Sequence, residues 1–391
     1  MIYLDNAATT PLHPKARAAM LPYLTEFYAN PSSVYTSARQ VRKAIDEARQ
    51  ITSSAINATP QEIFFTSGGT ESDTWALQGV AEAYGAGAHI ITCAVEHPGI
   101  NATCRFLEDK GCEITVVPVD STGAVNPADI QAAIKENTAL VSIMLANNEV
   151  GTIQPLAEIS KITKAHNIIL HTDAVQAVGH MPVNVEELGV DLLSLSAHKF
   201  YGPKGIGALY IRKGTKISPL LFGGAQERNR RAGTENVLGI VGLSAALKAV
   251  MEEMSVEQPR ITALRDELIS QILTQIPETK LNGATGANRL GGNVNISFRF
   301  IEGESLLLHL DMHGVYASTG SACSSGALEP SHVLMAMGVG HELANGAIRF
   351  TLGRENTTED IGALMEILKT SVQKLRDLSP LYDDFIKQQE T

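Results

Sequence analysis

Short apolar segments alternate with helix-like segments from about residue 60 to about residue 213, and this alternation restricts the fold more than any other feature of the sequence. The apolar segments are "EIFFTSG", "HIITCAV", "CEITVVPV", "ALVSIMLANNE", "IILHTDA", "DLLSLSA" and "GALYIRK". The helix-like segments between them include "TESDTWALQGVAEAYG", "GINATCRFLEDKG", "NPADIQAAIKEN" and "PLAEISKITKAHN". Such alternation is typical of a mostly parallel sheet covered by helices on both faces. The sequence therefore predicts an α/β fold around a mostly parallel, seven-stranded type of sheet.

Polar segments follow five of the predicted strands. They are "TSGGTES", "AVEHPG", "ANNEVG", "HTDAVQ" and "SAHKFYG". In open α/β sheets, ligands bind beyond the carboxyl ends of the strands. We therefore expect these five segments to converge on one ligand site.

The sequence changes in texture after about residue 258. A helix over "ENVLGIVGLSAALKAVMEEM" leads out of the first unit, and a further helix, "ITALRDELISQILTQI", precedes strands at "GNVNISFRF" and "GAIRFTLG". We predict a large α/β domain over residues 16–257. Residues 1–15 and 258–391 are predicted to form a smaller α/β domain, which carries a cysteine-containing loop at about 320–335.

Composition narrows the classes of function. The net charge of −11 and the lack of a basic cluster argue against nucleic acid as a partner. The longest apolar run is far shorter than the roughly 20 residues of a membrane span, and "MIYLDNAATTPLHP" lacks an export signal, so we expect a cytoplasmic protein. Cys93, Cys104 and Cys112 fit small buried apolar residues. The spacing of the cysteines and histidines does not predict a dedicated zinc site.

Three of the polar strand ends carry groups with distinctive chemistry. Lys199 follows an apolar strand, where desolvation lowers the pKa of an amine and makes it nucleophilic; a solvated loop lysine is the alternative. "SGGTES", with Thr70 and Glu71 opening a helix, is an arrangement that binds phosphate, although an ordinary helix cap also uses such residues. Asp173 either caps the next helix or pairs with a protonated ring nitrogen.

Together these groups are what pyridoxal 5′-phosphate (PLP) requires of a protein. The lysine would form a Schiff base, the aspartate would keep the pyridine ring protonated, and the helix start would bind the phosphate. His97 is placed to stack on the ring, or else makes ordinary hydrogen bonds.

Stretches spread over almost the whole chain then carry a resemblance to a known family. They are "YLDNAATTP", "NPSS", "TSGGTESD", "EHPG", "NNEVGTIQP", "HTDAVQAVG", "SAHKFYGPKGIGALY", "GGAQERNRRAGTEN", "STGSACSSGALEPSHVL" and "AIRFTLGREN". As a set they resemble the cysteine desulfurases of the NifS/IscS type, in the class V aminotransferase group of fold type I PLP enzymes. One departure is Tyr35, which follows "NPSSV" where many relatives have histidine.

The resemblance implies a role for each matching residue in cofactor binding. Lys199 would hold PLP covalently, Asp173 would pair with the pyridine nitrogen and His97 would stack on the ring. The residues implied to bind the phenolic oxygen are Asn148 and Gln176, and those implied to bind the phosphate are Gly69, Thr70, Ser196 and His198. Thr234 would reach the phosphate of a neighbouring subunit, which implies a homodimer.

The resemblance also implies a substrate and a reaction. Arg349 would bind the carboxylate of L-cysteine, with Asn148 beside it. Lys199, His97 and Cys323 would act in catalysis and give L-alanine and a persulfide on Cys323, in a Gly/Ser-rich stretch where an accessible thiol is expected. The sulfur would pass to an acceptor or iron–sulfur scaffold protein, and Cys323 would touch metal only transiently, through its persulfide.

Other functions stay open at this point. A selenocysteine lyase or another class V PLP aminotransferase would use Lys199 without needing Cys323. A non-catalytic nucleotide-phosphate binder would use only "SGGTES". The sequence does not identify the sulfur acceptor or separate a nitrogenase role from a housekeeping one.

Overall fold

The computed structural model describes residues 1–319 and 330–389. Its largest sheet has seven strands in the order β2-β8-β7-β6-β5-β3-β4, with β8 antiparallel to both of its neighbours and the other pairs parallel. The strands are β2 (Ile63–Thr66), β3 (His89–Cys93), β4 (Glu113–Val117), β5 (Thr138–Ser142), β6 (Ile169–Asp173), β7 (Leu192–Ser196) and β8 (Gly207–Ile211). The predicted mostly parallel α/β sheet is confirmed.

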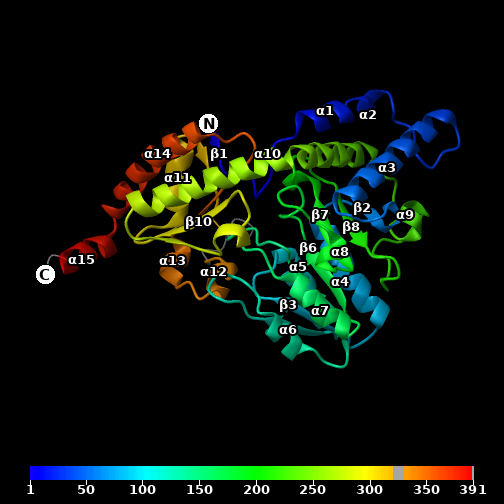
Figure 1. Ribbon diagram of the computed structural model, residues 1–391, viewed down its shortest axis with the longest axis horizontal. Coiled ribbons are helices and arrows are strands. Elements are labelled where there is room, and N and C mark those ends of the chain that lie inside the picture. Colours follow the sequence, from blue (N-terminus) through cyan, green and yellow to red (C-terminus); the bar gives the residue numbers. More distant parts are fainter. Residues whose placement is uncertain (320–329, 390–391) are drawn as a thin grey trace.

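Helices connect these strands and cover the sheet on both faces (Figure 1). They are α4 (Gly69–Tyr84), α5 (Pro98–Asp109), α6 (Pro127–Ala133), α7 (Leu156–Ala165) and α8 (Val185–Leu188). Short 3₁₀ turns also flank two strands, with η1 (Pro60–Glu62) before β2 and η2 (Ala197–Lys199) directly after β7. Since β2 and β7 are both antiparallel to β8, their carboxyl ends lie at the same edge.

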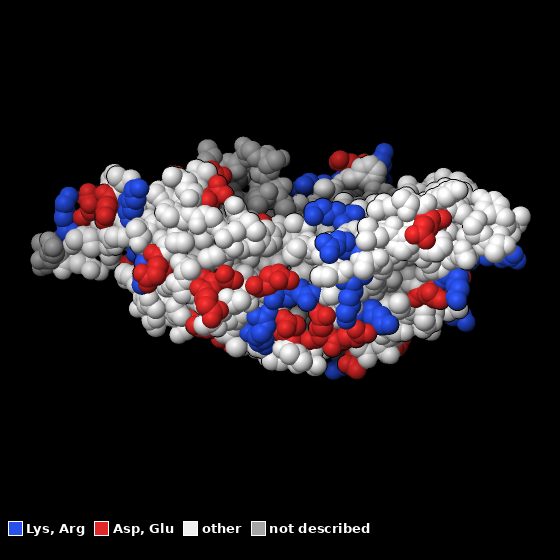
Figure 2. Space-filling view, turned by 90° about the horizontal axis from the view of Figure 1, so that it is seen from above, with Lys and Arg blue, Asp and Glu red and all other residues white. Residues whose placement is uncertain are grey.

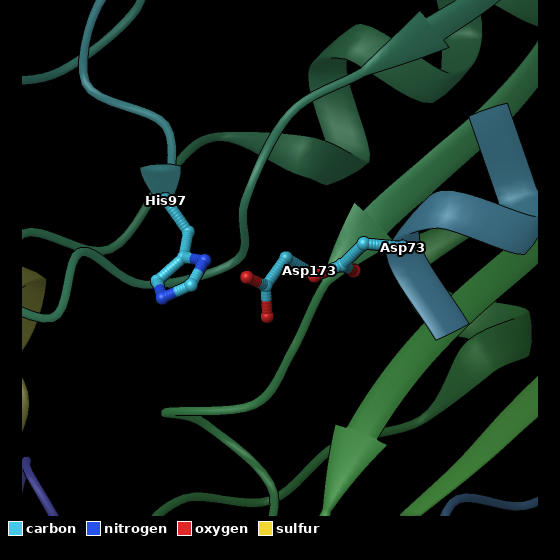
Figure 3. Close-up of side chains that lie close together, drawn as sticks. All are labelled: Asp73, His97 and Asp173. Atoms are coloured by element: carbon cyan, nitrogen blue, oxygen red, sulfur yellow. The ribbon is translucent and has the colours of Figure 1, made fainter. Parts of the chain in front are cut away.

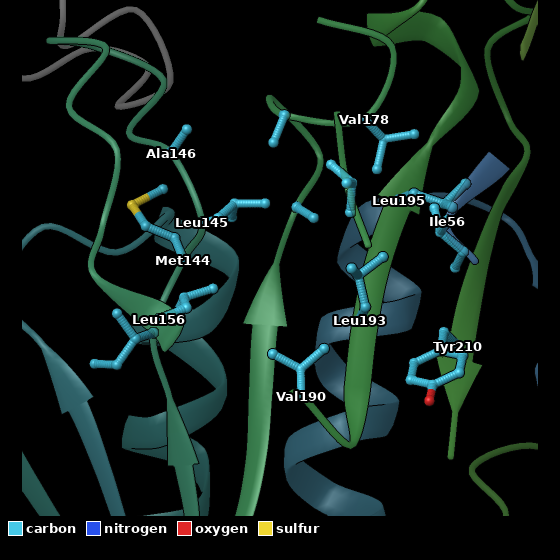
Figure 4. Close-up of a cluster of buried hydrophobic side chains, with 14 of the residues drawn as sticks. Ile56, Met144, Leu145, Ala146, Leu156, Val178, Val190, Leu193, Leu195 and Tyr210 are labelled. Atoms are coloured by element: carbon cyan, nitrogen blue, oxygen red, sulfur yellow. The ribbon is translucent and has the colours of Figure 1, made fainter. Parts of the chain in front are cut away.

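Alternate residues of the buried strands enter two different cores, as the two-residue repeat of a strand requires. Leu140 and Leu192 pack in a core with the helix residue Trp75. Val141 and Leu193, their neighbours in sequence, pack in the larger core on the other face, part of which Figure 4 shows around Leu193, Leu195 and Tyr210. Burial on both faces explains why these strands read as continuous apolar runs in the sequence.

The remaining sheets are formed by strands after residue 278 together with one strand at the N-terminus. β9 (Thr279–Leu281), β10 (Asn293–Phe298) and β12 (Ala347–Thr351) form an antiparallel sheet, and β1 (Ile2–Tyr3) pairs in parallel with β11 (Val315–Tyr316). Leu4 packs with Leu264, Ile296 and Phe350 in a separate core. The helices of this part are α11 (Gly303–Met312), α12 (His332–Ala336), α13 (His341–Asn345), α14 (Thr358–Arg376) and α15 (Pro380–Gln389), and a short 3₁₀ turn is η3 (Gly286–Asn288).

One long helix, α10 (Val237–Gln275), runs through both parts of the molecule (Figure 1). The sequence predicted two helices here, but the structure has one, with Pro259 inside it. Proline removes one helical hydrogen bond, and the helix continues because both sides of it are anchored by buried residues, such as Val250 before and Leu264 after. The predicted domain boundary at 257 and 258 falls within this helix, and the division into domains stays a prediction.

Other helices complete the end of the molecule nearest the large sheet. They are α1 (Pro14–Met20), α2 (Pro22–Thr25), α3 (Thr36–Ala55) and the short α9 (Gln226–Asn229). On the face shown in Figure 2, acidic and basic side chains are interleaved. Within the described residues, we find no helix that combines the length and the apolar character needed to cross a membrane.

Candidate active site

A pocket of about 340 Å³ lies at the carboxyl edge of the large sheet. Ten of the twelve residues predicted to form the site line it: Gly69, Thr70, His97, Asn148, Asp173, Gln176, Ser196, His198, Lys199 and Arg349. Thr234 is not among the lining residues and is exposed. Cys323 lies outside the described residues. All five polar segments that follow predicted strands therefore contribute residues to this one pocket, as predicted.

Lys199 reaches the pocket from the end of β7 through the turn η2. The strand itself is buried along its whole length, while Lys199 is only half-buried. The Nζ atom donates hydrogen bonds to the carbonyl oxygens of Ala7 (2.6 Å) and Ala8 (2.8 Å). The apolar strand thus places an amine in the pocket, where backbone carbonyl oxygens of the N-terminal segment accept its hydrogen bonds.

The floor of the pocket holds two buried carboxyl groups and an imidazole, shown in Figure 3. One carboxylate oxygen from each of Asp73 and Asp173 and one ring nitrogen of His97 all lie within 4.8 Å of one another. Burial raises the pKa of Asp173, although His97 and a hydrogen bond from the N–H of Val175 (2.9 Å) oppose the rise. Burial also lowers the pKa of His97.

Asp73 carries the second of these carboxyl groups. Burial, and then the nearby charge of Asp173, raise the pKa of Asp73 well above its usual value. Its Oδ1 atom has no hydrogen-bond partner within the described residues, and His171 Nε2 lies 3.6 Å away. His171 offers no charge, because burial lowers its pKa to about 3. Burial and the charge of Asp173 thus both favour the neutral form of Asp73.

A glycine-containing turn leads from β2 into α4 at one side of the pocket. Gly68 has φ 155° and ψ −175°, a conformation essentially restricted to glycine. A Cβ atom on Gly69 would lie 2.8 Å from Val175. Gly69 and Thr70 line the pocket, so the start of α4, where an anion binds most readily, borders it.

Two polar side chains after β7 face the same region. Ser196 is buried, and a Cβ atom on Gly68 would lie 3.8 Å from its Oγ. Burial, together with Lys199 and Lys204, lowers the pKa of His198 to about 4. His198 is therefore a neutral hydrogen-bonding group at pH 7, and its Nδ1 lies 3.2 Å from Thr9 Oγ1.

Arg349 provides a cation on the side of the pocket formed by β12. Its guanidinium group donates to the carbonyl oxygen of Asn148 and to Asp5 Oδ1, both at 3.0 Å. The side chain is 5% exposed, and its buried Nε has no hydrogen-bond partner among the described residues. A buried guanidinium with an unused donor is suited to a carboxylate ligand.

The described cysteines have a structural role. Cys93 and Cys104 are buried in apolar cores, as predicted, whereas Cys112, which was also predicted to be buried, is only half-buried and packs against one of these cores. Burial raises the pKa of all three thiols, that of Cys104 to about 12. The thiolate is the reactive form of cysteine, so these three residues are poor nucleophiles.

Comparison with known proteins places this site in a family. The class-V aminotransferase family matches residues 2–364. The chain is 56% identical over 380 residues to the cysteine desulfurase IscS of Dictyoglomus turgidum, covering 97% of this chain and 96% of that protein. It is 54% identical over 381 residues to the cysteine desulfurase IscS of Methanosarcina thermophila, with coverages of 97% and 94%. A solved NifS-like protein superposes with a TM-score of 0.88 at 38% identity, covering 96% of this chain and 99% of that one.

The chain belongs to the cysteine desulfurase branch of the class-V aminotransferase family. Enzymes of this family depend on PLP, and the pocket fits that cofactor on three independent observations. The glycine turn lies at a helix start, which suits an anion, the lysine amine lies just beyond the end of a buried strand, and Asp173 is a buried acid whose pKa stays raised although His97 and Lys199 lower it. A protonated ring nitrogen would add a positive charge beside this acid.

Sequence reasoning missed several residues of the class-V site. Asp73 was not singled out, although an acid among the buried residues of α4, next to Trp75 and Ala76, is a detectable signal. The "LDNAATTP" segment carries part of the resemblance to the family, but its residues did not predict that the carbonyl oxygens of Ala7 and Ala8 accept hydrogen bonds from Lys199. Those contacts depend on backbone groups, which every residue has.

Proposed function

We propose that this protein is a PLP-dependent cysteine desulfurase, which converts L-cysteine to L-alanine and leaves the sulfur as a persulfide on Cys323. The observation that supports this most strongly is the meeting of Lys199, Asp173, His97 and Arg349 around one pocket. Each of these residues has a chemistry that the reaction needs, and they come from segments up to 252 positions apart, 97 to 349.

The residues divide the work of binding and proton transfer. When bound, PLP supplies an electron sink that makes the Cα proton of an amino acid removable. Lys199 Nζ would hold the cofactor and, once released, take that proton. Asp173 would hold negative charge against the ring nitrogen, and His97 would lie over the ring. Arg349 would orient the substrate through its carboxylate.

The sulfur step requires a thiolate outside the three buried cysteines. Cys323, which lies outside the described residues, is the remaining cysteine of the chain. Its thiolate would attack the sulfur of the substrate, forming an S–S bond as the C–S bond breaks. The carbon keeps the electron pair and takes a proton, which gives L-alanine. The residue requirement separates this reaction from other class V PLP chemistry, which has no use for Cys323.

The assembly and cellular role are part of the same proposal. A homodimer would bring Thr234, which is exposed in the single chain, to the phosphate of the neighbouring subunit. The persulfide would pass to an acceptor or iron–sulfur scaffold protein in the cytoplasm.

Substitution of Cys323 tests the proposed reaction. We expect Cys323→Ser to abolish alanine formation from L-cysteine. We also expect it to abolish the one-sulfur increase in the mass of the peptide that contains residue 323, while the PLP absorbance stays unchanged. Cys104→Ser is the matched control and should retain both. Undiminished alanine formation in Cys323→Ser would instead favour another class V activity.

A further inference from the structure

The segment that carries Thr234 has an unusual backbone upstream of it. Glu227, Arg228 and Asn229 have φ values of 42°, 58° and 63° in succession. Left-handed conformations are unfavourable for residues with a Cβ atom, and a run of three persists only where the surroundings fix it. Such outliers often occur where function depends on the position of a segment.

Two contacts tie this backbone to β2, the strand that leads into the glycine turn. Glu227 is buried and pairs with Arg49 through two hydrogen bonds of 2.6 and 2.7 Å, while it accepts a third from the N–H of Phe65 at 3.1 Å. Arg228 donates to the carbonyl oxygen of Ile63 at 2.6 Å. The strained residues are thus anchored directly to the strand below the turn.

A third contact ties the segment to the turn itself. Arg231 donates to both carboxylate oxygens of Glu71, at 2.8 and 3.0 Å, and the two side chains are only 20% and 13% exposed. Glu71 lies in the first turn of α4 and also accepts a hydrogen bond from the N–H of Ser67 at 2.8 Å. The carboxylate of Glu71 therefore contacts both the glycine turn and Arg231, which lies three residues before Thr234.

We propose that Glu71 is a positioning residue that couples the two phosphate sites of the dimer. Through Ser67 it fixes the turn that receives the phosphate of its own subunit, and through Arg231 it fixes the approach of Thr234 to the phosphate of the partner. Glu71 does not line the pocket, so it acts on the cofactor only through these neighbours. The inference rests on the PLP site and homodimer of the proposed function, but not on the desulfurase reaction.

A double-mutant cycle on PLP affinity tests the coupling without measuring turnover. PLP is titrated into cofactor-free Glu71→Gln, Thr234→Ala and the double variant, and the Kd is read from the visible absorbance. We expect each single variant to raise Kd about tenfold, and the double variant to stay within about threefold of the weaker single variant, because removing Glu71 already misplaces Thr234. A double variant weakened about 100-fold would show independent effects and overturn the coupling, as would an unchanged Kd in either single variant.

Two further variants guard the interpretation. Glu158→Gln makes the same change in the first turn of α7, at an exposed residue, and should leave Kd unchanged. Should Glu71→Gln fail to fold, Arg231→Gln breaks the same ion pair from the other side and must show the same non-additivity with Thr234→Ala. If the unaltered chain bound no PLP, the proposed function would fall; if it bound PLP and Glu71→Gln did too with equal Kd, only this inference would fall.

Discussion

Two acids on helix α4, two residues apart, are in opposite environments, since Asp73 lines the pocket and Glu71 does not. Glu71 faces the segment before Thr234, where hydrogen bonds from Arg231 and Ser67 outweigh the effect of burial and lower its pKa. Asp73 faces the pocket floor, where burial and Asp173 raise its pKa. The same helix therefore carries one acid whose charged form is favoured, Glu71, and one whose neutral form is favoured, Asp73.

The largest expected effect lies on the pocket floor. Asp173→Asn keeps the shape of the side chain but removes the negative charge opposite the ring nitrogen. We expect kcat for alanine formation to fall about 10²–10³-fold, the range seen when one preorganised electrostatic group is lost, while KM for L-cysteine changes little. A loss below tenfold would contradict a working role for the charge of Asp173.

A smaller effect is expected at Asp73, where removal of the acid should stabilise the fold. The unfolded chain ionises Asp73 above a pH of about 4, whereas burial raises the pKa of Asp73 in the folded chain, so stability decreases as the pH rises from about 4 toward the raised folded pKa. Asp73→Asn removes this penalty of about 1.4 kcal/mol per pH unit. Urea unfolding should show the variant gaining stability over the unaltered chain as the pH rises above about 5. Parallel stability curves would contradict a raised pKa for Asp73 in the folded chain.

The smallest effect is expected at Glu71 and has the opposite sign. Its folded pKa is lowered, so its contribution to stability is present above the unfolded pKa of about 4.3 and disappears as the pH falls through the folded pKa. We expect Glu71→Gln to lower the free energy of unfolding by about 1 kcal/mol at pH 7, and we expect the difference from the unaltered chain to shrink as the pH falls below about 4. If the variant were as stable as the unaltered chain at pH 7, the charge of Glu71 would not stabilise the fold, and Glu71 would not differ from Asp73 in the way described.

Much of the fold and site follows from local sequence, because apolar strand runs and polar strand ends are local patterns. The β6 and β7 runs located Asp173 and Lys199 at the sheet edge. Features that depend on tertiary contact did not follow. The helix α10 continues through Pro259 because both of its halves contain buried residues. The raised pKa of Asp73 depends on burial and on Asp173, which is 100 positions away in the sequence.

Trapping of the cofactor on Lys199 tests the central claim most directly. The purified protein is incubated with PLP, reduced with borohydride, digested and mapped by mass spectrometry. We predict a phosphopyridoxyl group on Lys199 and none in Lys199→Ala, whose visible absorbance should also be lost. A wild-type chain that carries the label on other lysines only, or on none, would contradict the account.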